Sequence, residues 1–250
     1  MDKERKKMKV LDLFSGIGGF SLGLERAGME TVAFCEFDNH ARAVLNKHWP
    51  EIPIYDDVRA LNATKYRGTV DVVCGGFPCQ DLSVAGKQAG LEGHRSSLYR
   101  EMLRIISECL PPYAIFENVT GLITGDSGRW FAQFLYDLAE IGYDAEWHCI
   151  SAAYVGAPHH RDRVWVIAYP RKERGERGIA ESLSWVKGFS WCKDGRRVED
   201  LPKRSDLYPS QLCGGGDGIP KKLDRLARLG NAVLPQITEA IGRAIMAVET

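Results

Sequence analysis

Short apolar runs alternate along the first 170 residues with longer segments whose apolar residues recur every three or four positions. The short runs predict buried strands at 9–14, 30–36, 70–74, 113–117 and 163–168, and a further short strand around Ile54. The longer segments predict helices at 20–27, 39–48, 97–110 and 130–141. Strands that alternate with helices of this length indicate an α/β fold, in which a mostly parallel sheet has helices on both faces.

The pattern changes after Pro170. Residues 171–221 are rich in Lys, Arg, Gly, Ser and Trp and have little periodicity, which favours a small irregular lobe. Regular structure resumes near Leu223, and a helix is expected from Ala232 onward. We therefore expect a first domain over 1–170, a small lobe over 171–221 and a C-terminal segment over 222–250.

Ligands of such sheets bind beyond the carboxyl ends of the strands, which directs attention to the loops there. The first of these loops lies in the run DLFSGIGG at 12–19, whose glycines allow a close approach of backbone to a ligand. The dinucleotide fingerprint is absent, because Ser21 stands in place of its third glycine. Glu36 ends the next strand, where an acidic residue can bind both ribose hydroxyls. Asp57 is either a third ligand contact or a turn-forming residue.

The second loop has the sequence GGFPCQDLS at 75–83. Its cysteine, Cys79, follows a proline and two glycines at the end of a strand, so it is expected to be exposed and fixed in place. Those are the requirements of a nucleophile that acts as a thiolate. The alternative is a structural cysteine.

Two further segments carry charged residues. Glu117 ends a buried strand, and a carboxylate there is costly unless it is paired or has a chemical task. In the run HHRDR at 159–163, we expect Arg161 and Arg163 to point to opposite faces, one toward a pocket and the other toward an ion pair. Adjacent histidines ligate one ion with difficulty, so His159 and His160 do not indicate a metal site.

Composition narrows the class of protein. Apolar residues make up 44% and charged residues 26% of the chain, and no apolar run approaches the ~18 residues of a transmembrane helix. The seven cysteines show no Cys-x-x-Cys spacing. The charged N-terminal residues contain no signal-peptide core, so we expect a cytoplasmic protein with no membrane partner. The net charge is zero, yet residues 171–204 hold ten Lys or Arg against six Asp or Glu, which suits either phosphate binding or a solvated face.

Taken in order, the blocks DLFSGIGG, CEFD, GGFPCQDLS, ENV, RDR and LGNAVLPQ resemble those of the C5-cytosine DNA methyltransferase family. The resemblance covers the chain except for about 50 residues between Pro170 and Lys221. It implies a Rossmann-like methyltransferase sheet that binds S-adenosylmethionine, a target-recognition lobe, and a C-terminal helix that packs back on the first domain. The implied partner is double-stranded DNA, bound by a monomer, and a cognate restriction endonuclease is possible but not required.

The resemblance also implies roles for particular residues. Those expected to surround the cofactor are Phe14, Ser15, Gly16, Gly18, Gly19, Glu36, Asp57, Val58, Gly76, Pro78, Leu98, Asn231, Ala232 and Val233. Those expected to contact DNA are Gln80, Ser83, Gly86, Lys87 and Arg95. The catalytic set is Cys79, the nucleophile, with Glu117 as the acid, Arg163 at the base O2 and Arg161 as loop support.

Two departures from the family pattern bear on target recognition. The block that usually reads Q-R-R-x-R is here HHRDR, and the recognition region is short. Rival readings are an RNA cytosine methyltransferase and a non-catalytic DNA-binding paralogue. A nicotinamide dehydrogenase is disfavoured, because the fingerprint and a hydride-transfer constellation are missing.

Overall fold

The computed structural model describes residues 7–78, 98–157, 161–171 and 232–249. Within these ranges one seven-stranded sheet has the order β3-β2-β1-β4-β5-β7-β6. The strands are β1 (Lys9–Leu13), β2 (Glu30–Cys35), β3 (Ile54–Tyr55), β4 (Val72–Gly75), β5 (Tyr113–Val119), β6 (Tyr143–Ser151) and β7 (Asp162–Pro170). Strands β1 to β5 run parallel, whereas β7 pairs antiparallel with both β5 and β6. The predicted, mostly parallel α/β sheet is confirmed.

The main helices are α1 (Gly19–Arg26), α2 (Asn39–His48), α3 (Leu98–Cys109), α5 (Arg129–Glu140) and α7 (Pro235–Val248). Shorter pieces are α4 (Gly121–Thr124) and the 3₁₀ turns η1 (Thr64–Tyr66), η3 (Gly125–Gly128) and η4 (Ala152–Val155). The C-terminal helix begins three residues later than the expected Ala232, because Pro235 takes its first position, where a fixed φ and a missing N–H suit a helix start. Strand β1 ends before Phe14, whose φ of 52° leaves the extended region.

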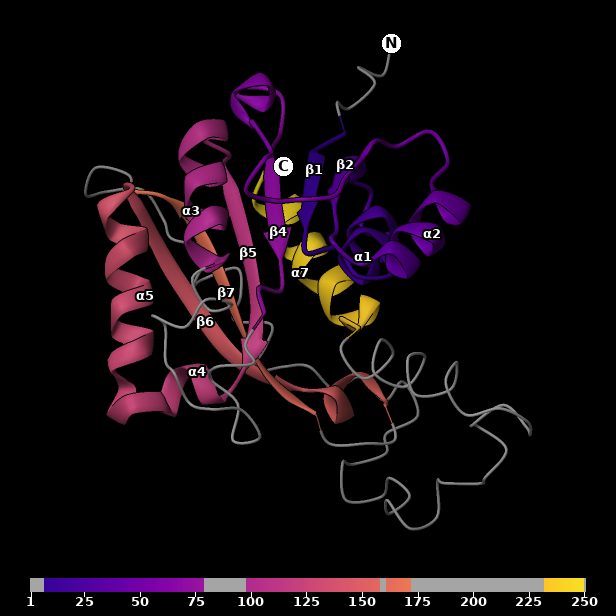
Figure 1. Ribbon diagram of the computed structural model, residues 1–250. Helices are drawn as coiled ribbons and strands as arrows, with labels where there is room; N and C mark the ends of the chain where they lie inside the picture. The colour runs from indigo at the N-terminus through magenta and orange to yellow at the C-terminus, as the bar shows by residue number, and fades with distance from the viewer. Residues whose placement is uncertain (1–6, 79–97, 158–160, 172–231, 250) are drawn as a thin grey trace.

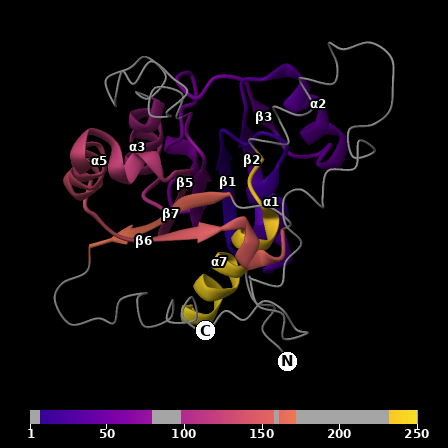
Figure 2. The same cartoon turned by 90° about the horizontal axis from the view of Figure 1, so that it is seen from below.

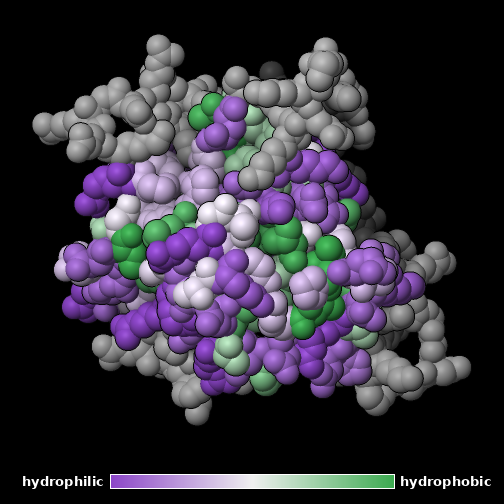
Figure 3. All heavy atoms as spheres, turned by 90° about the horizontal axis from the view of Figure 1, so that it is seen from above, coloured by the Kyte–Doolittle hydropathy of each residue, from purple (hydrophilic) through white to green (hydrophobic). Residues whose placement is uncertain are grey.

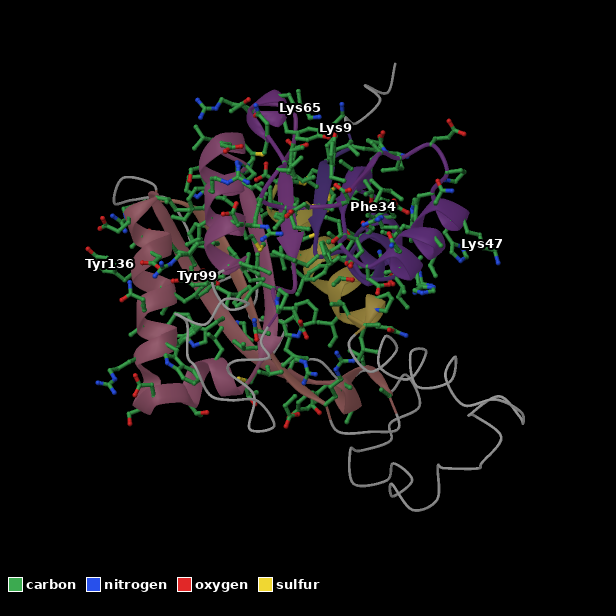
Figure 4. The ribbon with its side chains drawn as sticks, in the orientation of Figure 1. Lys9, Phe34, Lys47, Lys65, Tyr99 and Tyr136 are labelled. Carbon is green, nitrogen blue, oxygen red and sulfur yellow. The ribbon has the colours of Figure 1, made fainter. Side chains whose placement is uncertain are left out.

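Helices cover both faces of the sheet (Figures 1 and 2). On one face α3 and α5 pack on Leu11, Val73 and Phe116, with Phe134 of α5 at the centre of an aromatic group. The Tyr99 hydroxyl of α3, labelled in Figure 4, donates to Asp137 Oδ2 of α5 at 2.5 Å. The sequence expectation of helices on both faces is therefore confirmed.

The opposite face is covered by α1 and α7, which lie side by side in both ribbon views. Phe20 of α1 and Ile237 of α7 are buried in the same cluster as Trp165 of β7. The two helices approach closely because α1 presents glycine to α7. A Cβ at Gly23 would lie 1.9 Å from Thr238 Oγ1 and 2.2 Å from the Pro235 carbonyl oxygen.

One strand was missed by the sequence analysis. Strand β6 lies at the sheet edge, and its sequence YDAEWHCIS buries only its first and last residues. An edge strand of mixed polarity gives neither a continuous apolar run nor a strict alternation, so periodicity does not find it.

Figure 3 shows a mainly hydrophilic face with small separate hydrophobic groups. Among the described residues, none of the helices has the length and apolar character to cross a bilayer.

The α1–α7 contact predicts that Gly23→Ala destabilises the fold. The added methyl meets the Pro235 carbonyl, which is held in the backbone, so we expect a loss of about 1–3 kcal/mol in the free energy of unfolding. Leu22→Ala, on the exposed side of the same helix, is the matched control and should cost less. Urea denaturation of both variants measures the difference. An unchanged midpoint for Gly23→Ala would contradict the packing described.

Candidate active site

The ends of β1 and β2 are joined through Ser15. Its backbone N–H donates to the Cys35 carbonyl at 3.2 Å, and its hydroxyl donates to the Asp12 carbonyl at 2.7 Å. The Cys35 N–H in turn donates to the Ser15 hydroxyl at 3.2 Å. These bonds place the glycine turn (residues 15–19) directly beside Glu36, the residue that follows β2.

Glu36 lies across the mouth of this turn. One carboxylate oxygen accepts the Gly16 N–H and the other accepts the Asp38 N–H, both at 2.7 Å. Gly16 has a φ of 54°, and no atom lies within 4 Å of where its Cβ would be, so the space above the turn is open. A carboxylate oxygen has a second lone pair, which leaves Glu36 able to accept from a diol at the edge of that space.

The short strand β3 brings Asp57 and Val58 to the same edge. The Glu36 N–H donates to the Tyr55 carbonyl at 2.9 Å, which fixes β3 beside the end of β2. Val58 is buried in the core beneath the turn. The Asp57 carboxylate accepts from Arg59 Nε at 3.0 Å and Nη2 at 2.8 Å, and this pairing lowers the pKa of Asp57. Asp57 Oδ1 also accepts the Arg59 N–H at 3.0 Å, and the Asp57 carbonyl accepts the Ala60 N–H at 3.1 Å, so Asp57 forms a turn, and its contact with a ligand stays a prediction.

A second group of charged residues gathers where β5 ends and β7 begins. Arg163 Nε lies 3.0 Å from Glu117 Oε1, and both side chains are largely buried. Burial raises the pKa of Glu117, an effect that Arg163 and Arg161 oppose. The pair lines a small pocket together with Arg161, Trp165, Ala232, Val233, Leu234 and Ile237.

The expectation that Arg161 and Arg163 point to opposite faces is wrong. Residues two apart in an extended segment share a face, and both arginines line the same pocket. Arg161 Nη1 donates to the Ala232 carbonyl at 2.8 Å, so this side chain joins the start of β7 to the segment before α7. Burial lowers the pKa of Arg161.

The residues before position 79 are held against this charged group. A Cβ at Gly76 would lie 2.8 Å from Glu117 Oε2, so only glycine leaves room for the carboxylate. Asn118 Nδ2 donates to the Phe77 carbonyl at 3.2 Å, which fixes the backbone that leads into Pro78. Gly76 and Phe77 are therefore held beside Glu117 and Asn118.

The structure brings the expected residues together in two groups. Around the glycine turn are Phe14, Ser15, Gly16, Gly18, Gly19, Glu36, Asp57 and Val58, and around the pocket are Gly76, Glu117, Arg161, Arg163, Ala232 and Val233. Pro78 is the last described residue before position 79 and belongs to neither group. Leu98 begins α3 and packs against the core beneath the turn. The expected residues Cys79, Gln80, Ser83, Gly86, Lys87, Arg95, His159, His160 and Asn231 lie outside the described residues.

The sequence analysis missed two aromatic residues. Trp165 lines the pocket, and the alternation of β7, two residues on from Arg163, was the signal that could have found it. Phe37, 77% exposed directly after Glu36, is an aromatic side chain left in solvent at a strand end. Within the part of the chain that is described, no three His, Cys, Asp or Glu residues form a group able to hold a metal.

A family model described as C-5 cytosine-specific DNA methylase matches residues 8–205. This chain belongs to that family. It is 35% identical over 216 residues to the Type II methyltransferase M.Eco47II of Escherichia coli, a match that covers 85% of this chain and 50% of the relative. It is 33% identical over 168 residues to M.HhaI of Haemophilus parahaemolyticus, covering 67% and 51%. The chain thus spans about half the length of these relatives.

The fold of the chain agrees with a solved structure. The methyltransferase EhMeth of Entamoeba histolytica superposes with a TM-score of 0.65 and 16% identity, covering 98% of this chain and 100% of that one. At this identity the likeness concerns the fold alone. The expected Rossmann-like methyltransferase sheet is confirmed.

The buried Asp12 predicts that the stability of the protein depends on pH. Asp12 is fully buried, its Oδ1 has no partner among the described residues, and burial raises its pKa from 3.8 to about 7. The folded protein then holds a proton that the unfolded chain releases, so Asp12 makes stability fall by up to about 1.4 kcal/mol per pH unit as pH rises from about 4 to 7. Above pH 7 this contribution is flat.

Asp12→Asn keeps the shape and removes the titration. The difference in unfolding free energy between this variant and the wild type should grow in favour of the variant between pH 5 and pH 8, as measured by urea denaturation at each pH. The depressed Asp57 carboxyl is present in both proteins and cancels. A difference that stays constant with pH would rule out the buried protonated Asp12.

The Glu117–Arg163 pair predicts a strong energetic coupling. Arg163→Gln leaves a buried carboxylate without its nearest counter-charge and should cost about 3 kcal/mol. Adding Glu117→Gln should restore part of this, with a coupling of about 1–3 kcal/mol in a double-mutant cycle. Arg171→Gln breaks an ion pair with Asp144 that is about half exposed and should cost less than about 1 kcal/mol. Equal costs for the two arginines would contradict the buried character of the first pair.

Proposed function

We propose that this methylase transfers a methyl group to C5 of cytosine in DNA, with Cys79 as nucleophile. The observation that carries the proposal is the buried Glu117–Arg163 pair, which lies where the backbone of Gly76 and Phe77 leads toward position 79. Glu117 and Arg163 lie at one edge of the sheet, and a family with this activity in its name matches the chain, so we favour catalysis over a purely structural role for this pair.

The chemistry explains the residue types. Cytosine C5 is a weak nucleophile, and addition of the Cys79 thiolate to C6 makes C5 electron-rich enough to take a methyl group. The C5 proton then leaves, the C5–C6 double bond re-forms and the thiolate is expelled. A base stacked in a duplex cannot be reached in this way, so the cytosine must be flipped out of the helix.

Glu117 and Arg163 stabilise the charge that develops on the ring. The raised pKa of Glu117 suits a carboxyl group that gives or shares a proton at the base N3, as a general acid does. Arg163, held against Glu117, can donate to the base O2. Arg161 anchors the start of β7 to the Ala232 carbonyl and so keeps the pocket closed on that side.

The glycine turn suits S-adenosylmethionine, whose sulfonium supplies the methyl group. Glu36 accepts at the rim of an open turn, where ribose hydroxyls can donate to it, and Phe14 and the exposed Phe37 offer aromatic faces nearby. Asp57 can accept from the adenine amino group. We further propose that the protein acts as a monomer, because one flipped base needs one pocket.

The reaction is tested by base-resolution 5-methylcytosine sequencing of DNA from a methylation-free bacterial host that expresses the chain. We expect methylation within one short motif. Cys79→Ser should abolish it, and Cys149→Ser, at an exposed cysteine of β6, should leave it unchanged. Methylation that survives Cys79→Ser would remove this cysteine from the mechanism.

A second assay separates DNA from RNA as the substrate. Purified protein is incubated with duplex DNA or tRNA and labelled S-adenosylmethionine, again beside Cys79→Ser. Incorporation into the duplex alone supports the proposal. Incorporation into tRNA alone would replace DNA with RNA, and none into either would favour a non-catalytic paralogue.

A further inference from the structure

The segment that follows β3 is irregular, and its backbone is held by side chains of α3. Arg104 of α3 donates from Nη2 to the Val58 carbonyl at 2.8 Å and from Nη1 to the Leu61 carbonyl at 3.1 Å. Glu108 of α3 accepts the Ala63 N–H at 2.7 Å. The Val58 carbonyl also accepts the Leu61 N–H at 3.4 Å, so the bond that Arg104 donates is the shorter of its two.

Arg104 is itself fixed on both sides. Its Nε lies 2.8 Å from Glu101 Oε2 and its Nη1 lies 2.5 Å from Glu108 Oε1, one turn away in each direction along α3. The side chain is only one-third exposed. A guanidinium has five donors in a rigid plane, so this arginine can serve two carboxylates and two carbonyls at once.

The contact with Val58 reaches Asp57 through a single peptide unit. The Val58 carbonyl and the Arg59 N–H belong to the same planar group, and that N–H donates to Asp57 Oδ1 at 3.0 Å. Arg104, by fixing the carbonyl, also fixes the direction of the N–H that holds the Asp57 carboxylate.

We propose that Arg104 is a positioning residue that aims the Asp57 carboxylate at the amino group of the cofactor adenine. The inference rests on the proposed function, in which Asp57 reads that amino group. Arg104 contributes no contact of its own to the cofactor. The Arg59 side chain pairs with the Asp57 carboxylate directly, and Arg104 adds a hold on the peptide unit whose N–H donates to the same carboxylate. Together they give an exposed carboxylate a fixed direction, which discrimination between an amino group and an oxygen requires.

Arg67 provides a matched control. It joins the same two parts of the fold, because its Nε donates to the Glu108 carbonyl at 2.9 Å and its Nη2 to the Ser107 carbonyl at 3.2 Å. It follows η1, which Lys65 marks in Figure 4, and none of these bonds involves Val58 or the Arg59 peptide. Loss of Arg67 should loosen α3 from this segment without turning Asp57.

The test is calorimetric binding of two ligands, S-adenosylhomocysteine and S-inosylhomocysteine, which carries an oxygen in place of the adenine amino group. The wild type should bind S-adenosylhomocysteine at least about tenfold more tightly than S-inosylhomocysteine. Arg104→Met should weaken the adenosyl ligand about tenfold and the inosyl ligand little, so that the preference collapses. Arg104→Lys retains a charge between the two glutamates and a donor for one carbonyl, and should keep most of the preference. Arg67→Met should keep all of it.

Each outcome decides a separate point. If Arg104→Met keeps the wild-type preference, the positioning role is overturned. The same holds if Arg67→Met loses the preference as fully as Arg104→Met. In either case Arg104 only stabilises the packing of α3 on this segment. If Arg104→Met does not fold, Arg104→Lys decides. Complete loss of the preference for the adenosyl ligand in Arg104→Lys would contradict the expected partial rescue. Equal wild-type affinity for both ligands would overturn the inference but leave the proposed function standing. Failure of the wild type to bind either would instead count against the proposed function.

Discussion

The reversal of one strand determines what this sheet can do. At the carboxyl edge of the sheet, each parallel strand ends, so the residues that follow it lie there. The antiparallel β7 begins at this edge, so its first residues lie there too. Val119 at the end of β5 therefore lies opposite Arg163 near the start of β7, and Glu117 meets a cation across the ladder. A carboxylate this deeply buried needs that partner, because the free energy lost on its desolvation is larger than the stabilisation that most single contacts give. The pocket, its acid and its arginines all follow from this one antiparallel pairing.

Glycines matter as much as charged residues in bringing the glycine turn and the charged pocket together. Gly19 lies so close to the segment before α7 that a Cβ would sit 2.4 Å from the Val233 carbonyl oxygen, and Gly76 leaves the space that Glu117 occupies. The glycine turn and the charged pocket therefore share a wall made of backbone. Phe20 and Trp165, in edge-to-face contact with centroids 5.7 Å apart, close the space beneath it.

The sequence was sufficient for the features that depend on local pattern. Helix α2 was predicted at about its observed bounds, and the structure shows the Asp38 carboxylate accepting the His40 and Ala41 N–H groups at its start. Glu36, directly after β2, and Glu117, near the end of β5, were found because apolar runs end there. Side-chain partnerships between distant elements left no such signal: the hold of Arg104 on Val58 joins residues 46 positions apart, and no periodicity encodes it. The shared face of Arg161 and Arg163 was available from alternation and was misassigned. The roles of Cys79 and the other residues outside the described ranges stay predictions.

The contact between Thr238 and the Gly19 carbonyl joins positions 219 residues apart. The helix that starts at Pro235 is made long after α1, yet it supplies one wall of the pocket and covers α1, the helix that follows the glycine turn. A nascent chain that has already formed its sheet therefore exposes the apolar faces of Phe20 and Trp165 until that helix is made. A chain translated only as far as β7 thus has no complete pocket.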